Sequence, residues 1–179
     1  DAMPSDSTSP QIRQQVMELS SRYFSDLKSN RKSLAETFVR TARGNWSKRC
    51  LADGDGESIS CGKSLVKAIV LSKKIAGLSK GTDNVGILLP PSVGGALTNI
   101  ATTLLGKTSV NLNYTVSHEA RIYAVEQCGI KCVISSREFI KKAKLEIIPG
   151  MVFIEDIVSE VRTSEKISAL LKARFLPRK

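Results

Sequence analysis

Residues 85–115 read VGILLPPSVGGALTNIATTLLGKTSVNLNYT, and this stretch decides the fold. The continuous apolar run at its start stops at two prolines, which is typical of a strand buried on both faces. Ser92 can then cap a helix, and Gly106 can separate that helix from a second short strand. The order strand, helix, strand predicts a βαβ unit with parallel strands. Its three elements are expected at residues 85–89, 93–105 and 109–112.

The same alternation continues towards the C-terminus. Ser117 can cap another helix, and Gly129 lies where that helix should end. Four apolar runs that alternate with helices predict an α/β fold with a Rossmann-like parallel sheet. A last amphipathic helix with several basic residues is expected at residues 163–175. The remaining elements are expected as helices at residues 118–127 and 137–144 and strands at residues 131–135 and 151–154.

Two helices are expected before this α/β region. Apolar residues recur at three- and four-residue spacing across residues 10–28, which predicts an amphipathic helix. Ser33 and Glu36 match a capping box, so a second helix should begin at residue 34 and end near Gly44.

A hairpin is expected around the DGDG sequence at residues 53–56, because Asp-Gly pairs between two short strand-like runs favour a tight turn. The acidic spacing here is similar to the start of a calcium loop. However, Ser58 and Ser64 stand where such a loop needs its sharp-turn glycine and its bidentate glutamate. We therefore favour the turn. A helix is expected next, at residues 62–78, with its inner side formed by Leu65, Ala68, Ile69, Ile75 and Leu78.

Two tripeptides are similar to the end of a phosphate-binding P-loop, GKS at residues 62–64 and GKT at residues 106–108. The full pattern G-x4-G-K-[ST] needs another glycine five residues before the glycine of the tripeptide. Glu57 and Ala101 stand at those two positions. A side chain there hinders the backbone from wrapping around phosphate. We conclude that neither tripeptide forms a P-loop.

Three further features each have a functional and a structural interpretation. Gly94 and Gly95 begin a helix, where backbone amides can bind an anion, but adjacent glycines also allow close packing, which we favour. His118, the only histidine, has no evident nucleophile nearby in sequence and adjoins Glu119 at a helix start. A solvated or capping role is therefore preferred. The basic run at residues 141–144 is interpreted as a solvated helix face.

Composition limits the possible classes of protein. The 179 residues are 41% apolar and 25% charged, as in ordinary globular proteins. The net charge of +10 lies mainly in the two ends of the chain, and aromatic residues make up only 5%. Basic surfaces that read nucleic acid more often carry aromatic side chains, so nucleic-acid binding is not favoured. The sequence has no apolar run of membrane-spanning length and no signal-peptide pattern at its start.

The four cysteines do not show the paired spacing of a zinc site. A zinc ion would need all of them, or three with His118, gathered from distant positions. Reduced thiols in a cytosolic protein are the favoured interpretation. The cysteines are Cys50, Cys61, Cys128 and Cys132.

Residues 85–115 resemble the acyl-adenylate-forming (AMP-binding) ligases. These share a strand ending in proline, a helix, and a glycine before a strand that leads into an asparagine-containing turn. Here the glycine is Gly106 and the turn is NLNYT at residues 111–115, to which we assign a role in shaping the fold. Residues 126–137 (EQCGIKCVISSR) are similar to the family's next helix–strand unit.

One branch of the family is most similar. The double proline, SVGGA at residues 92–96, NLNYT and QCGI at residues 127–130 resemble the bacterial acyl-acyl-carrier-protein synthetases that are fused behind a glycerophospholipid acyltransferase domain. The helical segment at residues 12–44 resembles the linker between those two domains. The resemblance implies a parent protein that activates a fatty acid with ATP and passes it to acyl carrier protein, for re-acylation of a lysophospholipid.

Several motifs of the family are absent from this sequence. They are the phosphate loop S-G-[ST]-T-G-x-P-K-G, the Thr-Glu motif for Mg-ATP, the ribose-binding Asp and the adenylating Lys, all of which the family carries later in the chain. The upstream H-x4-D acyltransferase motif is also missing, because Tyr123 stands where an Asp should follow His118. No residue is therefore assigned as catalytic, cofactor-binding or metal-binding. ATP and Mg are expected only for the full-length protein, and this fragment is expected to be inactive alone.

The resemblance also implies partners. They are the missing remainder of the ligase domain and, for the full-length protein, acyl carrier protein, fatty acid and lysophospholipid. The basic ends suit the anionic cytoplasmic face of a bacterial membrane, although the last helix could instead pack on that missing remainder. The alternative is a stand-alone basic module that binds a protein partner or nucleic acid.

The expected organisation has four parts. They are a flexible leader at 1–9, a helical linker segment at 10–45, a partial N-terminal subdomain of an AMP-binding ligase at 46–162, and an amphipathic basic helix at 163–179.

Overall fold

A computed structural model describes residues 9–29, 32–54 and 56–175. The predicted leader at residues 1–9 therefore lies almost entirely outside the described residues. The chain divides into two compact units, Asp1–Ser33 and Leu34–Lys179. In the first unit the structure describes one helix, α1 (Ser9–Ser29), on which apolar residues such as Ile12, Val16 and Leu19 are more than half exposed.

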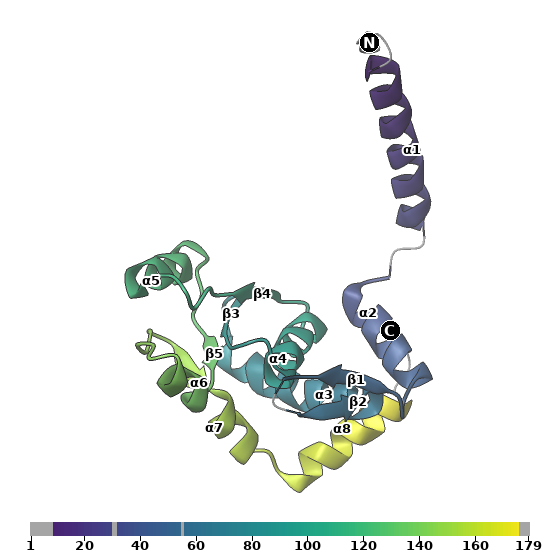
Figure 1. Ribbon diagram of the computed structural model, residues 1–179. Helices are drawn as coiled ribbons and strands as arrows, with labels where there is room; N and C mark the ends of the chain where they lie inside the picture. The colour runs from purple at the N-terminus through teal and green to yellow at the C-terminus, as the bar shows by residue number, and fades with distance from the viewer. Residues whose placement is uncertain (1–8, 30–31, 55, 176–179) are drawn as a thin grey trace. The chain divides into compact units, whose positions relative to one another are not determined.

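A parallel four-stranded sheet forms the centre of the second unit (Figure 1). The spatial order is β4-β3-β5-β6, and every neighbouring pair is parallel. The predicted α/β class is thus confirmed. The chain adds β4 on one side of β3 and then crosses β3 to add β5 and β6 on the other side, as in doubly wound flavodoxin-like sheets. The strands are β3 (Asn84–Leu88), β4 (Thr108–Asn111), β5 (Val133–Ser135) and β6 (Met151–Phe153).

Serine caps begin the helices that follow three of these strands. The hydroxyl oxygens of Ser92, Ser117 and Ser136 accept hydrogen bonds from the backbone N–H three residues later. Each cap satisfies a donor that the first helical turn would otherwise leave unpaired. The helices are α4 (Val93–Leu104), α5 (His118–Gln127) and α6 (Arg137–Lys142). Their starts agree with the sequence prediction.

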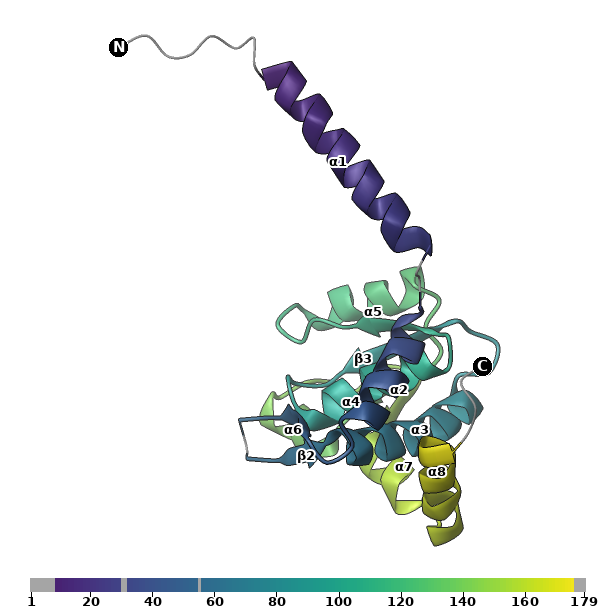
Figure 2. The ribbon, with the colours of Figure 1, turned by 90° about the vertical axis from the view of Figure 1, so that its right-hand side faces the viewer.

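Each face of the sheet carries its own hydrophobic core. Val85 of β3 and Ile134 of β5 face a core with α3 (Cys61–Leu78), α4 and α7 (Ile154–Ser159). Leu88 and Val133 lie an odd number of residues from Val85 and Ile134 along their strands. They face a second core with α5 and α6. This alternation follows from the two-residue period of a strand. Figure 2 shows α5 on one side of the sheet and α3 and α7 on the other.

A third cluster joins α2 (Leu34–Gly44), α3 (Cys61–Leu78) and α8 (Thr163–Phe175). Its buried members are Ala42, Cys61, Leu65 and Ala173, and Trp46 packs against them. The Arg43 side chain donates hydrogen bonds to the carbonyl oxygens of Ala173 and Lys172, at 2.6 and 2.9 Å. The contacts therefore group α2 with the α/β unit, whereas the sequence interpretation placed it with α1 in one segment at residues 10–45.

Some predicted faces differ from the structure. Leu78 was expected on the inner side of α3 but is 41% exposed, because α3 buries Leu71 and Ser72 instead. The predicted apolar stripe of α8 is also exposed, since α8 packs on its neighbours through two alanines. The short helix α7 (Ile154–Ser159) was not predicted; it follows β6 directly, and its capping residue Phe153 makes no side-chain cap bond. No described helix is long and apolar enough to cross a membrane.

The predicted hairpin is present as β1 (Arg49–Ala52) and β2 (Ser58–Ser60), which pair antiparallel. In the turn, Asp53 Oδ1 accepts a hydrogen bond from the Glu57 N–H at 3.0 Å, and the Asp53 N–H donates to the Glu57 carbonyl oxygen at 3.0 Å. Asp53 thus closes the turn, as the preferred interpretation of the DGDG sequence requires.

Candidate binding groove

A groove of about 600 Å³ lies where β3 and β4 end at the carboxyl edge of the sheet. This is the edge at which doubly wound sheets bind ligands. We call it the carboxyl-edge groove. Its walls are mainly apolar, with a few amide and hydroxyl groups. It is lined by Ala52, Ile87, Leu89, Pro90, Pro91, Ser92, Gly95, Ala96, Asn99, Asn111, Leu112, Asn113 and Tyr114.

Two amides meet at the wall of this groove. Asn99 Nδ2 donates to Asn111 Oδ1 and Asn111 Nδ2 donates to Asn99 Oδ1, both at 3.0 Å. Asn99 Nδ2 also donates to the Gly95 carbonyl oxygen at 3.1 Å. The pair ties α4 to the end of β4, and each amide still has a free lone pair or hydrogen. Asn111 was predicted to shape the fold, and this reciprocal contact supports that role.

The loop after β4 forms the rim of the groove. Asn113 Oδ1 accepts hydrogen bonds from the Thr115 N–H at 2.9 Å and from the Thr115 hydroxyl at 2.8 Å, which makes a local Asx turn. The Tyr114 ring meets the Phe139 ring edge-to-face, with centroids 5.3 Å apart. Arg121, only 4% exposed, donates to the Val116 carbonyl oxygen. These contacts hold the rim in one conformation.

The start of α4, beside the groove, is already supplied with acceptors. Asp53 Oδ2 accepts a hydrogen bond from the Val93 N–H at 3.2 Å, and Ser92 Oγ accepts one from the Gly95 N–H at 3.1 Å. A Cβ at Gly95 would lie 2.8 Å from the Pro90 carbonyl oxygen. Packing thus explains Gly95, and a protein carboxylate occupies the position that an external anion would take.

The next strand end, at β5, is closed by hydrogen bonds and acidic residues. Ser135 Oγ, fully buried, donates to the Leu88 carbonyl oxygen at 2.7 Å and so joins β5 to β3. Glu155 Oε1 accepts from the Ser136 hydroxyl and from the Arg137 N–H, at 2.7 and 3.0 Å. The carboxylate of α7 therefore lies at the first turn of α6, where the helix dipole favours negative charge.

Arg137 and Asp156 make a bidentate ion pair, with both N···O distances 2.6 Å. The Arg137 guanidinium also lies 4.4 Å from the centre of the Phe153 ring. Hydrogen bonding by Arg137 holds the pKa of Asp156 below its ordinary value. This pair joins α6 to α7 at the surface.

The two lysine tripeptides have structural roles. A Cβ at Gly62 would lie 2.5 Å from two ring atoms of Trp46, so the glycine makes room for the indole. Lys107 Nζ donates to the Ser79 carbonyl oxygen at 2.9 Å and to the Thr82 carbonyl oxygen, and so closes the C-terminal end of α3. Gly62 thus serves packing, and Lys107 serves closure of a helix end.

His118 lies at the first turn of α5, as predicted, with Nε2 3.8 Å from Glu146 Oε2. Its Nδ1 is buried without a hydrogen-bond partner. The pKa of the neighbouring Glu119 is lowered by hydrogen bonds to its carboxylate from the Glu119 backbone N–H and from the Ser117 side chain. Among the described residues no three His, Cys, Asp or Glu side chains gather as a metal site.

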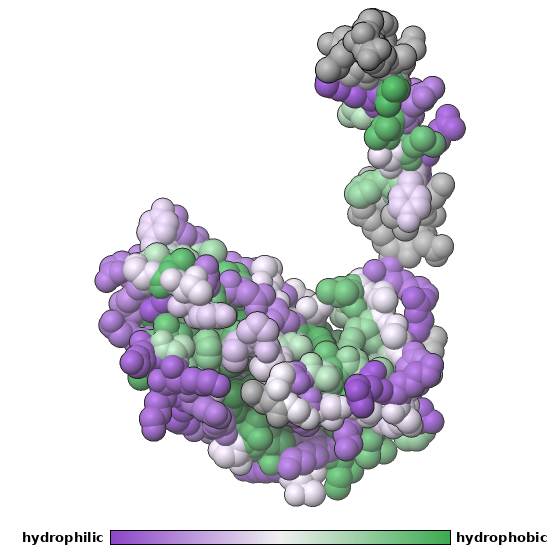
Figure 3. Space-filling model, viewed as in Figure 1, coloured by the Kyte–Doolittle hydropathy of each residue, from purple (hydrophilic) through white to green (hydrophobic). Residues whose placement is uncertain are grey.

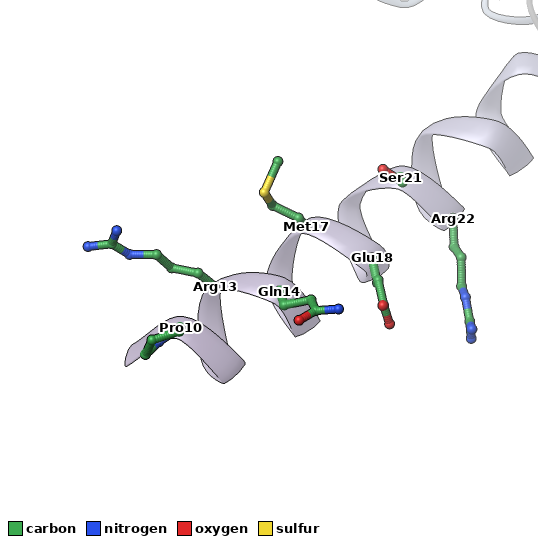
Figure 4. Close-up of a pocket in the computed structure, with 7 residues that line it drawn as sticks. All are labelled: Pro10, Arg13, Gln14, Met17, Glu18, Ser21 and Arg22. Carbon is green, nitrogen blue, oxygen red and sulfur yellow. The ribbon is translucent and has the colours of Figure 1, made fainter. Parts of the chain in front are cut away.

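Other surfaces offer less enclosure than the carboxyl-edge groove. A space of about 910 Å³ lies along α1, and its lining residues, including Arg13, Met17 and Arg22, all come from that single helix (Figure 4). A space lined by only one helix has no opposing wall. On the α/β unit, Figure 3 shows apolar residues between hydrophilic ones on one face. The exposed apolar residues of α8 include Ile167, Leu171 and Phe175.

No protein-family model matches the chain. Several solved structures share its fold. O-succinylbenzoate coenzyme A synthetase (MenE) from Bacillus subtilis, in complex with AMP, is 20% identical with a TM-score of 0.59, over 69% of this chain and 32% of that one. The N-terminal domain of FACL13 from Mycobacterium tuberculosis is 14% identical with a TM-score of 0.61, over 75% of this chain and 38% of that one. The N-terminal subdomain of NpsA from Klebsiella oxytoca is 15% identical with a TM-score of 0.61, over 73% and 33%.

These matches define the fold class. The α/β unit has the fold of the N-terminal domain of adenylate-forming ligases, as the sequence predicted. The chain spans about a third of the length of the solved structures that it matches.

Proposed function

We propose that this chain is the front part of an ATP-dependent, adenylate-forming ligase. The observation that carries the proposal is the fold of the α/β unit, with its parallel sheet in the order β4-β3-β5-β6. This chain is similar to MenE, FACL13 and NpsA at TM-scores of 0.59 to 0.61. The ligase motifs quoted from residues 85–137 support it independently, since they were recognised in the sequence itself.

The proposed substrate class is a fatty acid, with acyl carrier protein as acceptor. The motifs SVGGA, NLNYT and QCGI support this assignment through their resemblance to the bacterial 2-acylglycerophosphoethanolamine acyltransferase/acyl-ACP synthetase. The mainly apolar carboxyl-edge groove is compatible with part of an acyl chain. The parent protein would then supply acyl groups for re-acylation of lysophospholipids.

We further propose that the chain by itself does not catalyse adenylation. That reaction develops charge between a carboxylate and the α-phosphate of ATP, which basic donors and magnesium must offset. Gly62 and Lys107 belong to the two tripeptides that are similar to a phosphate-binding loop. Gly62 serves packing and Lys107 closes the end of a helix. ATP and Mg would be bound by the remainder of the ligase domain, and this unit would position that remainder and form one wall of a substrate site.

The proposed location of the parent protein is the cytoplasmic face of a bacterial membrane. The support is the concentration of basic residues in the two ends of the chain and the exposed stripe of Ile167, Leu171 and Phe175 on α8 beside Lys172. Vesicles containing anionic lipid should bind the chain more strongly than neutral vesicles, and added salt should weaken that binding. Equal binding to both kinds of vesicle would refute the membrane proposal.

The functional test is formation of acyl carrier protein thioesters. This chain and the longer reading frame are each incubated with ATP, Mg²⁺, palmitate and holo-acyl carrier protein, and the mass of the carrier is measured. The longer protein should add the acyl group, and this chain alone should not. If the longer protein activates only non-fatty acids, or loads only coenzyme A, the fatty acid and carrier assignments fail while the ligase class stands.

The alternative is a stand-alone basic module for a protein partner or nucleic acid. The encoding reading frame separates the two proposals. A frame that continues into a Gly-rich S-G-x-T-G segment favours the ligase. A frame without it, together with salt-sensitive binding of an acidic partner, favours the module.

A further inference from the structure

All four cysteines lie in the described part of the chain, and all are free thiols in the structure. They differ in their surroundings. Cys132 is buried against the core that faces α3 and α4, and burial raises its pKa. Cys128 is half-buried against the core on the opposite face of the sheet. These two thiols therefore belong to separate clusters on the two faces of the sheet.

Cys50 and Cys61, in contrast, belong to one cluster. Cys61 is a buried member of the third cluster, at 7% exposed, and Cys50 packs against the same cluster but is only half-buried. Each cysteine directly follows one member of the paired residues Arg49 and Ser60, so the two thiols occupy neighbouring positions of the hairpin. The pairing of these positions was not predicted from the sequence, because ten residues and a hairpin turn separate them.

The backbone explains why the two thiols meet. Arg49 pairs with Ser60 and Leu51 pairs with Ile59, so Cys50 is the extra residue of a β-bulge between those pairs. The Cys61 N–H donates a hydrogen bond to the Lys48 carbonyl oxygen at 2.8 Å, which holds the first residue of α3 beside the start of β1. A bulge re-aims the side chain of the extra residue, and here that side chain packs against the same cluster as Cys61.

We infer that Cys50 and Cys61 form a dithiol modification site that is oxidised reversibly to an intramolecular disulfide by a low-molecular-weight disulfide such as oxidised glutathione. Nothing in this inference depends on the proposed ligase function. It depends on the shared cluster, the bulge and the differing exposure of the two thiols.

The two thiols would act in a fixed order. Burial raises the pKa of Cys61, and the neighbouring Cys50 raises it further, so Cys61 stays protonated for longer. Cys50, the more exposed thiol, would lose its proton to solvent and attack one sulfur of oxidised glutathione, releasing one glutathione thiolate. Cys61 would then lose its proton and attack the Cys50 sulfur, releasing the second glutathione. The protein loses two electrons and two protons, and glutathione disulfide gains the two electrons.

Oxidation would fix the hairpin at the edge of the carboxyl-edge groove. Ala52, two residues after Cys50, lines that groove, and Asp53 caps α4. Cross-linking across ten intervening residues should raise the melting temperature by roughly 5–10 °C, from the entropy lost by the unfolded chain. The disulfide would therefore hold one lip of the groove in place.

The experiment is peptide mapping of the folded full-length chain after treatment with oxidised glutathione. Trypsin cleaves after Arg49 and Lys63, so both thiols lie in one peptide, residues 50–63. Remaining thiols are alkylated before digestion. We expect this peptide to lose two hydrogens and to carry no alkyl group or glutathione, while Cys128 remains available to alkylation or to glutathione alone. Dithiothreitol should restore two alkylatable thiols and reverse the rise in melting temperature.

Two variants make the result decisive. Cys128→Ser should oxidise as the wild type does, because Cys128 lies in another cluster. Cys50→Ser, at a half-exposed position that should tolerate the change, should leave Cys61 unoxidised and abolish the thermal shift. A stable glutathione adduct on Cys50 that Cys61 does not displace would overturn the inference. So would a disulfide that appears only in urea, or one that joins Cys50 to Cys128 as readily as to Cys61.

Discussion

Replacing Gly62 with alanine tests whether the GKS tripeptide is a packing site. The added Cβ would lie 2.5 Å from Trp46 Cδ2 and Cε2 and 2.9 Å from Trp46 Nε1. The indole cannot move freely, because it packs in the third cluster and lies 5.4 Å from the Arg174 guanidinium. Forcing extra volume into such a site costs about 1–3 kcal/mol.

The helix itself offsets part of this loss. Alanine is favoured over glycine by up to about 1 kcal/mol inside a helix. We therefore expect Gly62→Ala to lower the free energy of unfolding by about 1–2 kcal/mol, which corresponds to roughly 2–8 °C in melting temperature for a chain of this size. Urea denaturation followed by tryptophan fluorescence measures the change, since Trp46 is the only tryptophan.

Gly77→Ala is the matched control in the same helix. Gly77 is exposed, and no heavy atom lies within 4 Å of a Cβ added there. Alanine should therefore stabilise the protein at this position by about 0.5–1 kcal/mol. In a double-mutant cycle, Trp46→Leu should remove most of the penalty of Gly62→Ala. All four proteins of the cycle are followed by far-UV circular dichroism, because Trp46→Leu removes the fluorescent probe. If Gly62→Ala stabilises the protein as much as Gly77→Ala does, the packing explanation is wrong.

Three further changes test other contacts. Asp53→Ala, measured by thermal melting, should lower the free energy of unfolding by about 1 kcal/mol, because the Val93 N–H at the start of α4 loses its acceptor. Asp53→Glu, measured in the same way, tests whether the position of the carboxylate matters. Lys107→Met keeps the aliphatic stem but leaves carbonyl oxygens at the end of α3 unpaired, and should destabilise by about 1.5–3 kcal/mol in urea. Arg137→Gln should reduce the amount of folding stability that the protein loses when the pH is lowered. The folded pKa of Asp156 lies below its ordinary 3.8, so this pair stabilises the protein above that pH and the stabilisation disappears as pH falls through the folded pKa. The variant should be less stable at neutral pH but should lose less stability than the wild type between about pH 5 and 2; an unchanged pH profile would contradict this.

The regular elements could be predicted because their signals are local. The apolar run before Pro90 and the serines at the helix starts each report on a few neighbouring residues. Gly106 and Gly129, which follow helices with positive φ values of 70° and 56°, also mark those ends directly. Strand order is different, because nothing within β5 indicates that it pairs with β3 and not with β4.

The site was only partly predictable, since its key contacts join distant residues. Asp53 was correctly assigned to a turn, but its bond to the Val93 N–H spans forty positions. Lys107 was predicted to lie outside a P-loop, but its contact with the Ser79 carbonyl oxygen could not be inferred from spacing. The approach of Cys50 to Cys61 depends on a bulge, which alternation patterns do not reveal.

Side-chain exposure was the least predictable feature. The apolar stripe of α8 was identified correctly in the sequence, yet α8 buries Ala169 and Ala173 and leaves Ile167 and Phe175 exposed. Small residues allow helices to approach closely, so they can form the contact face even when a larger apolar stripe is present on the same helix. A single-sequence pattern finds apolar stripes but does not show which face is packed within the unit.

The most direct test of the proposed function is ATP–pyrophosphate exchange with long-chain fatty acids, which reports formation of an acyl-adenylate without any acceptor. This chain and the longer reading frame are compared at the same concentration with Mg²⁺ present. We predict fatty acid-dependent exchange by the longer protein and none by this chain. Exchange by neither protein would contradict the ligase assignment, and exchange by this chain alone would contradict the structural roles given to Gly62 and Lys107.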